Sequence, residues 1–333
     1  MMRLFPKGIS RFGVLSLAAL ATVLLVAACG GGDGDRDKLV VALDWFPNAD
    51  HAGLYAAQAQ GYFEDEGLDV VLEPPVRPED PPLFVASGRV DIGISYEPDV
   101  IQARAQGIPI IAIAAIVPVP LNSIQTLKTS GLTHPSQLAG KTIGYPGIPS
   151  NRVYLQTVLR NVGVDPSSVK LVNVGFNLGP ALRGKRVDAT IGTYWNVEAV
   201  EAELKGFPVN VMHLQDYGVP VYDELVFIVH EDSVQSKKDL LQRFLRAVAR
   251  GHQFAARNPD AAADAVKEAN EAMELELIVQ GVRLLAPLWA GMEPFGLMDE
   301  AKWQAFVDFL FENGVLENRV PVDTLMTNEL IPR

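Results

Sequence analysis

Aromatic and acidic side chains follow several predicted strands of this 333-residue chain. The aromatic residues that end a predicted strand or lie in the turn beside one are Trp45, Tyr96, Tyr145, Tyr194, Trp195 and Tyr222. The acidic residues that accompany them are Glu97, Glu198, Asp223 and Glu224. Aromatic faces stack on planar rings, and carboxylates accept hydrogen bonds from amines and ring N–H groups. The set therefore favours a flat, nitrogen-rich ligand that is uncharged or cationic.

Motifs for covalent, metal or dinucleotide chemistry are missing from the sequence. The five histidines are dispersed, and neither a Gly-x-Ser-x-Gly elbow nor a complete Gly-x-x-x-x-Gly-Lys-Ser/Thr loop occurs. Gly144-Tyr145-Pro146-Gly147 lacks the dinucleotide fingerprint, because Pro146 has no N–H to donate. We therefore expect no metal, no cofactor and no enzymatic activity. In an enzyme, His51 would be the best candidate for a reactive group; the alternative is that it starts a helix and orients Trp45 or Asn48.

One segment leaves the charge of the ligand open. Ser150-Asn151-Arg152 begins a predicted helix, and helix N-termini bind phosphate groups. The same residues are explained equally well as an ordinary N-cap. The acids listed above argue for ligand amines rather than an anion, so a neutral ligand ranks first.

The strands and helices that must position these residues alternate from Lys38 onward, which is typical of α/β domains with largely parallel sheets. The predicted strands are residues 39–43, 70–72, 90–94, 109–117, 141–145, 169–174, 187–191, 210–213 and 225–229. Residues 233–313 are predicted to be helical, and we expect this tail to return and cover the first sheet. Lobe 1 would then comprise residues 38–130 and 228–333, and lobe 2 residues 131–227.

Two segments, one in each predicted lobe, resemble each other. Gly88–Glu97 and Gly184–Trp195 each contain a turn, a short strand and a tyrosine, with one residue inserted in the second. Ligands of open α/β sheets bind beyond the carboxyl ends of the strands. Tyr96 and Tyr194 are therefore predicted to face one place from opposite lobes. The alternative is that the shared Arg-Val-Asp is only a common turn.

The N-terminus carries a separate pattern. Three basic residues precede an uncharged apolar run at residues 14–26, and two alanines and Cys29 follow it. The run is shorter than the roughly 20 residues that a membrane-spanning helix needs, and the pattern looks like a bacterial lipoprotein signal. It predicts a signal peptide at residues 1–28, a lipid on Cys29, a flexible tether at residues 29–37 and an extracytoplasmic protein held at the cell membrane. The alternative is a short N-terminal anchor with an incidental cysteine.

Composition narrows the partners further. The formal net charge of −12 argues against nucleic acid, because binding phosphates needs basic surface. Hydrophobic residues make up 48% of the chain and charged residues 20%, which indicates a globular protein with a full core. The length fits two domains, and a single cysteine leaves no pair for a disulfide.

The segment Asp44–Tyr55, followed by Gly61-Tyr62-Phe63, resembles the opening of solute-binding proteins of the thiamine-pyrimidine-synthesis (NMT1/THI5-like) family. Weaker similar stretches lie at residues 95–98, 144–147, 192–198 and 221–225. The resemblance implies a two-lobed periplasmic-binding-protein fold of the type II-like kind. Each lobe would be a mostly parallel sheet flanked by helices, with the ligand cleft between the lobes.

The resemblance also implies a function. It indicates the binding component of an ABC importer, with permease and ATPase subunits as partners and a small planar heterocycle as ligand. A pyrimidine precursor of thiamine, such as hydroxymethylpyrimidine or formylaminopyrimidine, is the first expectation. The residues expected to contact it are Trp45, Asn48, His51, Tyr96, Glu97, Tyr145, Gly147, Tyr194, Trp195, Glu198, Tyr222 and Glu224.

Two alternatives come from the same family. Some relatives bind riboflavin, which is also a flat heterocycle, so a riboflavin importer is the first alternative. The family also includes yeast enzymes that make the pyrimidine from their own histidine and pyridoxal phosphate. This chain lacks the cysteine-rich segment of those enzymes and carries an export signal, so an extracytoplasmic pyrimidine-synthesising enzyme is the second alternative.

Overall fold

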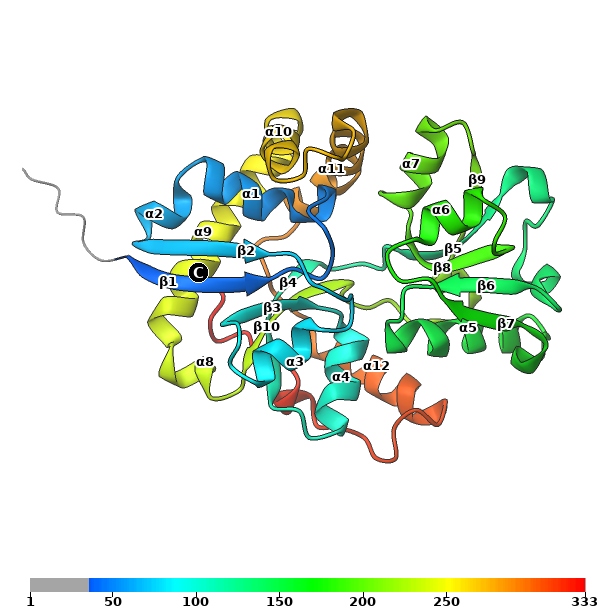
Figure 1. Ribbon diagram of the computed structural model, residues 1–333. Helices are drawn as coiled ribbons and strands as arrows, with labels where there is room; N and C mark the ends of the chain where they lie inside the picture. Colours follow the sequence, from blue (N-terminus) through cyan, green and yellow to red (C-terminus); the bar gives the residue numbers. More distant parts are fainter. Residues whose placement is uncertain (1–35, 333) are drawn as a thin grey trace, which may run out of the picture. The chain divides into compact units, whose positions relative to one another are not determined.

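The protein is described by a computed structural model that covers residues 36–332. Two five-stranded sheets form its framework, each with helices on both faces (Figure 1). The predicted signal peptide, Cys29 and nearly all of the predicted tether lie outside the described residues. Within residues 36–332, none of the helices is long and apolar enough to cross a membrane.

The first sheet has four strands that run in one direction and one that runs against them. Its order is β2 (Leu68–Glu73), β1 (Asp37–Ala42), β3 (Ile92–Ser95), β10 (Leu225–His230) and β4 (Ile110–Val117). β10 pairs antiparallel with both β3 and β4, while β1 pairs parallel with β2 and β3. Every residue of β4 is buried, which explains why this strand reads as an unbroken apolar run.

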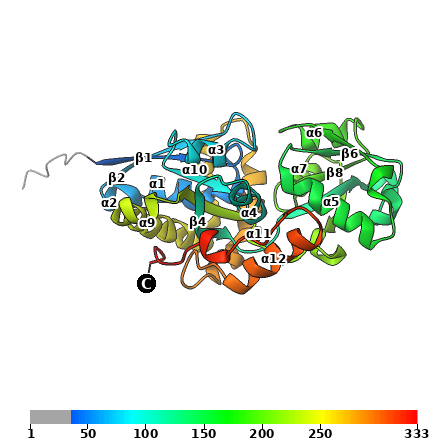
Figure 2. The same ribbon diagram turned by 90° about the horizontal axis from the view of Figure 1, so that it is seen from below.

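Helices from both ends of the chain cover this sheet (Figures 1 and 2). On one face lie α1 (Ala52–Ala59), α2 (Tyr62–Asp65), α9 (Lys238–Arg257), α10 (Pro259–Ala269) and α11 (Leu275–Ala290). On the other lie α3 (Pro81–Ala86), α4 (Glu97–Ala105) and α12 (Glu300–Glu312), and the short α8 (Ser233–Ser236) follows β10. Leu241, Phe244, Leu245 and Val248 of α9 are buried in the same apolar cluster as the strands of this sheet. The helical tail therefore does return to cover the first sheet.

The second sheet has the same arrangement of directions. Its order is β7 (Lys170–Asn173), β6 (Thr142–Tyr145), β8 (Ala189–Tyr194), β5 (Asn122–Leu127) and β9 (Val209–His213). β5 is the strand that runs against the other four. One face carries α6 (Leu178–Arg183) and α7 (Glu198–Leu204), and the other carries α5 (Pro149–Asn161) (Figure 1).

The chain passes between the sheets twice, after β4 and after β9. β5 belongs to the second sheet, so the first crossing lies ahead of the lobe boundary predicted after residue 130. The second crossing ends at β10, which begins shortly before the predicted boundary after residue 227. β5 was not predicted as a strand because polar side chains occupy several of its buried positions. Ser123, for example, is fully buried and donates a hydrogen bond to the carbonyl of Thr193.

Candidate functional site

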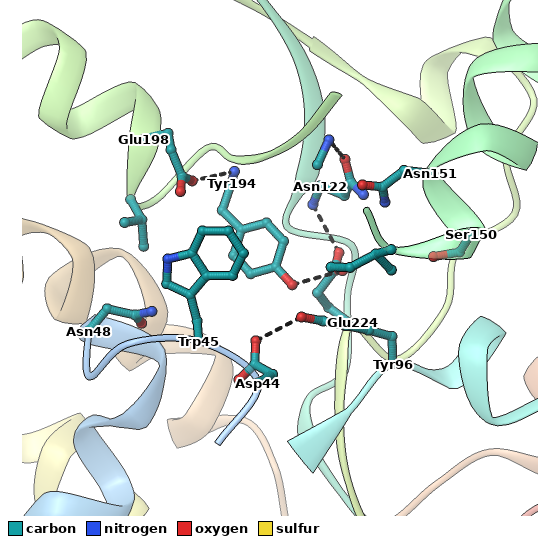
Figure 3. A pocket seen from close by; sticks show the side chains of 13 residues that line it. Asp44, Trp45, Asn48, Tyr96, Asn122, Ser150, Asn151, Tyr194, Glu198 and Glu224 are labelled. Atoms are coloured by element: carbon teal, nitrogen blue, oxygen red, sulfur yellow. Dashed lines mark hydrogen bonds between the residues drawn. The ribbon is translucent and has the colours of Figure 1, made fainter. Parts of the chain in front are cut away.

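A cleft with about 440 Å³ of empty space lies between residues of the two sheets, beyond the carboxyl ends of β1, β3 and β8 (Figure 3). The first lobe, built on the first sheet, contributes Asp44, Trp45, Asn48 and Tyr96. The second lobe and the crossings contribute Asn122, Ile148, Ser150, Asn151, Gly192, Tyr194, Val197, Glu198 and Glu224.

The wall of the first lobe is tied together by buried Asp44. Its Oδ1 accepts a hydrogen bond from Nε2 of His51 at 2.9 Å, and its Oδ2 accepts one from the Tyr96 hydroxyl at 3.0 Å. Nδ1 of His51 in turn accepts from the backbone N–H of Asn48 at 3.2 Å. Asn48 closes a capping box with His51 at a short 3-10 helix, Ala49–His51. These bonds fix the turn that carries Trp45.

Glu224 joins the two crossings. Its Oε2 accepts hydrogen bonds from the backbone N–H groups of Leu121 and Asn122, at 2.7 and 2.9 Å, and from the Tyr222 hydroxyl at 2.9 Å. Its Oε1 accepts from the Tyr194 hydroxyl at 3.1 Å. Burial raises the pKa of Glu224 to about 7. This carboxylate therefore holds the two connecting segments and one cleft tyrosine in a fixed arrangement.

The wall of the second lobe contains a buried polar atom that has no partner among the described residues. Oε2 of Glu198 accepts from the backbone N–H of Tyr194 at 2.7 Å, and burial raises the pKa of Glu198 to about 7. Oδ1 of Asn122 accepts from the N–H of Gly192 at 2.9 Å. Oδ1 of Asn151 is buried and has no hydrogen-bond partner among the described residues. Asn151 reaches this position because Gly192 has a φ of 86° and no Cβ, which would lie 2.3 Å from Asn151 Oδ1.

The cleft is acidic. Asp44, Glu198 and Glu224 line it, and none of the described lining residues is a lysine, arginine or histidine. Such a set pairs with neutral or cationic hydrogen-bond donors and disfavours an anion, because an anion would have to leave water for a site that offers no opposite charge.

Aromatic contacts join the lobes at the edge of the cleft. The Trp45 ring meets Phe176, which lies between β7 and α6, with centroids 4.5 Å apart and planes at 79°. Phe46 meets the same ring at 4.6 Å. Oδ1 of Asp50 accepts a hydrogen bond from Nδ2 of Asn196 across the lobes at 2.6 Å. Burial raises the pKa of Asp50 to about 7, against the opposing effect of that hydrogen bond.

Six of the predicted contact residues line the cleft: Trp45, Asn48, Tyr96, Tyr194, Glu198 and Glu224. Tyr96 and Tyr194 face it from opposite lobes, as the internal similarity of the two strand-and-turn segments predicts. The other six predicted residues lie elsewhere.

Three of these six are buried beneath the residues that line the cleft. Both ring nitrogens of His51 are engaged, with Asp44 and with Asn48, so it supports the cleft rather than lining it. Glu97 is fully buried and accepts from the N–H of Asp223, which fastens α4 to the second crossing. The hydroxyl of Tyr222 donates to Glu224 while its ring stacks on Tyr154.

The remaining three contact residues outside the cleft lining. Nε1 of Trp195 donates to the carbonyl of Pro120, and its ring packs edge-on against His213. The ring of Tyr145 lies 5.9 Å from the guanidinium of Arg152. Gly147, with a φ of 99°, turns beside the side chain of Asn173. Gly147 thus lies beside the end of β7 while the next residue, Ile148, lines the cleft, a difference that sequence spacing alone does not reveal.

Several lining residues were not predicted to contact ligand: Asp44, Asn122, Ile148, Ser150, Asn151, Gly192 and Val197. Asp44 stands directly before the Trp-Phe-Pro-Asn segment, and Ser150-Asn151 was considered as an anion site or an N-cap, so both carried a signal. Asn122 had none, because its place depends on the unpredicted strand β5.

Comparison with known proteins adds to this geometry. A family model described as NMT1/THI5-like matches residues 48–262. The formylaminopyrimidine-binding protein of Halalkalibacterium halodurans is 36% identical over 93% of this chain and 96% of its own length. A putative thiamine biosynthesis protein of Haemophilus influenzae is 31% identical over 84% of this chain and 88% of its own. A 4-amino-5-hydroxymethyl-2-methylpyrimidine phosphate synthase of Saccharomyces cerevisiae is 26% identical over 67% of this chain and 68% of its own.

Solved structures share the fold at lower identity. The alkanesulfonate-binding protein of Xanthomonas axonopodis pv. citri superposes with a TM-score of 0.68 at 14% identity, covering 88% of this chain and 99% of its own. The periplasmic nitrate-binding protein of Synechocystis PCC 6803 gives 0.70 at 14% identity, covering 89% and 87%. The two-lobed periplasmic-binding-protein fold expected from the sequence is thereby confirmed, with four of the five strands in each sheet running one way.

Proposed function

The chain belongs to the NMT1/THI5-like family, and we propose that it is the solute-binding component of an ABC importer for a neutral aminopyrimidine precursor of thiamine. Hydroxymethylpyrimidine and formylaminopyrimidine are the ligands that fit the proposal first. The observation that carries it is the acidic cleft, which is lined by Trp45, Tyr96 and Tyr194 and has no basic side chain among its described residues.

The chemistry of the cleft matches that ligand class. The Trp45 and Tyr194 rings offer faces on which a flat pyrimidine stacks, one from each lobe. Oε1 of Glu198 accepts no hydrogen bond from another described residue, so it is available to accept from an exocyclic amine. The amide of Asn151 offers an acceptor and a donor side by side, which is the pattern that pairs with an amino group next to a ring nitrogen.

Capture follows from closure of the lobes. A ligand that contacts both walls is bound best when the lobes are together, so it shifts the population toward the closed form. The contacts of Trp45 and Phe46 with Phe176, and of Asp50 with Asn196, join the lobes beside the cleft. Permease and ATPase subunits would then receive the ligand from the closed form.

A pyrimidine-synthesising enzyme is the main competing function, because relatives such as the yeast synthase catalyse a reaction. Two observations count against it. His51 is buried with both ring nitrogens engaged, and it does not line the cleft. A phosphorylated substrate or product would meet three carboxylates and no basic side chain among the described lining residues. We therefore propose binding without catalysis.

The proposed anchor is Cys29, which lies outside the described residues. The apolar run that ends before it supports cleavage at residue 28, lipid attachment and an extracytoplasmic location. Mass spectrometry of membrane-extracted protein is expected to find a diacylglyceryl-modified Cys29 at the new N-terminus. An intact leader, or cleavage at another residue, would refute this part of the proposal.

Calorimetric titration of the purified protein tests the proposed ligand. Hydroxymethylpyrimidine and formylaminopyrimidine should bind, and riboflavin should bind far more weakly or not at all. The absorbance spectrum of the freshly purified protein provides an independent check, because a carried-over flavin is yellow and a pyrimidine is colourless. A yellow protein that binds riboflavin in preference to either pyrimidine would identify a riboflavin importer instead.

A further inference from the structure

The two lobes also meet where α4 of the first lobe lies beside α5 of the second (Figures 1 and 2). Asp99, in the first turn of α4, is 8% exposed and sits at this seam. Its Oδ1 accepts a hydrogen bond from the backbone N–H of Ser150 at 3.2 Å, and its Oδ2 accepts one from the Ser150 hydroxyl at 3.0 Å. Both bonds therefore cross from one lobe to the other.

Ser150 lies at the N-terminus of a helix, so these bonds also act on a helix end. It is the second residue of α5, a helix of 13 residues whose own N-cap residue, Ile148, provides no side-chain cap. The first residue, Pro149, has no N–H. A helix needs acceptors for its first N–H groups and favours negative charge at this end. Asp99 supplies the acceptors from the opposite lobe, and it supplies the negative charge above pH 7, because burial raises its pKa to about 7.

The surroundings of Asp99 point to the same role. It forms no ion pair in the described part of the chain, and its two hydrogen bonds both go to Ser150. Ser150 and Asn151 also line the ligand cleft, so the carboxylate stands directly behind the wall that the ligand contacts. A negative charge at this helix end opposes a second anion in the cleft.

We propose that Asp99 is a specificity-determining residue that acts as a built-in anion at the N-terminus of α5. It holds the lobes together without an anionic ligand, and it keeps that helix end from serving a phosphate or carboxylate group. The part of this inference that concerns ligand choice rests on the proposed function, whereas the part that concerns closure does not.

The seam is accessible to a small probe. A second cavity, with about 600 Å³ of empty space, is lined by Asp99 together with Ser95 and Gln102 of the first lobe and Ile148 and Pro149 of the second. Removing the Asp99 carboxylate would leave room for acetate next to the N–H of Ser150. Chemical rescue by acetate is therefore a direct test.

The test measures the separation of the lobes in Asp99→Ala without any heterocycle. Spin labels are attached to Asp69→Cys on β2 and Lys170→Cys on β7, two exposed positions, in a Cys29→Ser chain at pH 8, where the Asp99 carboxylate is ionised. The ratio of closed to open populations should fall roughly ten- to a hundredfold, the range for losing a hydrogen-bonded charge. Acetate should restore much of the closed population in the variant and leave the parent unchanged.

Asp165→Ala is the matched control. Asp165 accepts from the N–H and the hydroxyl of Ser167, at 2.9 and 2.7 Å, but both residues lie in one lobe. Its loss should not alter lobe separation, with or without acetate. Equal populations in the parent and in Asp99→Ala, or a loss of closure that acetate does not reverse, would overturn the proposal.

A second arm concerns ligand choice. Asp99→Asn keeps the shape of the side chain and removes its charge. The affinities of this variant and of the parent for inorganic phosphate and for hydroxymethylpyrimidine are measured. The ratio of the affinity for hydroxymethylpyrimidine to that for phosphate should be at least tenfold smaller in the variant. An unchanged preference would refute the specificity role. If the parent binds no pyrimidine, the proposed function fails, while the spin-label result still decides the role of Asp99 in closure.

Discussion

The two walls of the cleft use their polar atoms differently. In the first lobe, both oxygens of Asp44 are engaged by His51 and Tyr96, and the side chain of Asn48 bonds to its own turn. In the second lobe, Oδ1 of Asn151 has no partner among the described residues. The first wall is therefore built in advance as a rigid surface, and the second leaves Oδ1 of Asn151 as an acceptor for the ligand.

This difference indicates that the first wall fixes the shape of the site, whereas the second wall discriminates between ligands. A wall whose hydrogen bonds are satisfied internally holds its aromatic ring without help from the ligand, which lowers the entropy lost on binding. A wall with available polar atoms discriminates, because a ligand that does not satisfy them leaves buried groups unpaired. Changes in the first lobe should therefore affect stability most, and changes in the second should affect selectivity most.

The largest expected effect comes from Asp44→Ala. The change leaves Nε2 of His51 and the Tyr96 hydroxyl without their buried partner. Each hydrogen bond to a charged group contributes about 1.5–3 kcal/mol, so the free energy of unfolding should fall by about 3 kcal/mol. Urea unfolding measures this. A loss below about 1 kcal/mol would show that the first wall is not held by this network.

Glu198→Gln should act in the opposite way. The free energy of unfolding should not fall, because Gln still accepts from the N–H of Tyr194 and carries no charge whose burial raises a pKa. Affinity for an aminopyrimidine should fall by roughly tenfold to a hundredfold, and the preference over an analogue without the amine should narrow. Calorimetric titration with both compounds measures the two effects. If both affinities match those of the parent, Glu198 does not read the ligand.

Trp45→Ala separates ring stacking from packing. Loss of one stacking face should cost about 1–3 kcal/mol in binding. The matched control is Trp289→Ala, in which a buried tryptophan donates from Nε1 to the carbonyl of Ile116, away from the cleft. The control should lower stability and spare affinity. Unchanged affinity in Trp45→Ala would remove this ring from the binding site.

The sequence alone predicted the first wall better than the second. Trp45 and Asn48 lie in one turn after β1, and Tyr96 directly follows β3. Local spacing was sufficient there because each side chain follows a strand that is itself apolar.

The second wall depends on contacts between distant segments. Asn122 takes its place through β5, whose buried polar residues hide the strand, and Asn151 reaches the cleft only because Gly192 lies beneath it. Tyr145, the last residue of β6, and Gly147 were expected at the cleft, but Tyr145 lies near Arg152 and Gly147 beside Asn173, while Ile148 of the same loop lines the cleft. The positions of these residues follow from tertiary packing, so no local sequence pattern indicates them.

A fourth prediction concerns the pH dependence of stability and Glu224, whose carboxylate joins the two crossings. Burial raises its pKa from 4.5 to about 7, so the folded chain holds this proton more tightly than the unfolded chain. The contribution is present below pH 4.5 and is lost as pH rises through about 7. Within this window, Glu224→Gln should make the slope of unfolding free energy against pH less negative. Parallel pH profiles for parent and variant would contradict the assignment.

The central claim is that the cleft selects a neutral heterocycle through an acidic wall without basic side chains among its described residues. The most direct test is the ratio of the affinities of the parent protein for hydroxymethylpyrimidine and for its phosphate ester, measured by calorimetry in one buffer. Desolvating a phosphate beside three carboxylates without an opposite charge should disfavour the ester by at least about 3 kcal/mol, or roughly a hundredfold. Equal affinities, or tighter binding of the ester, would contradict the account.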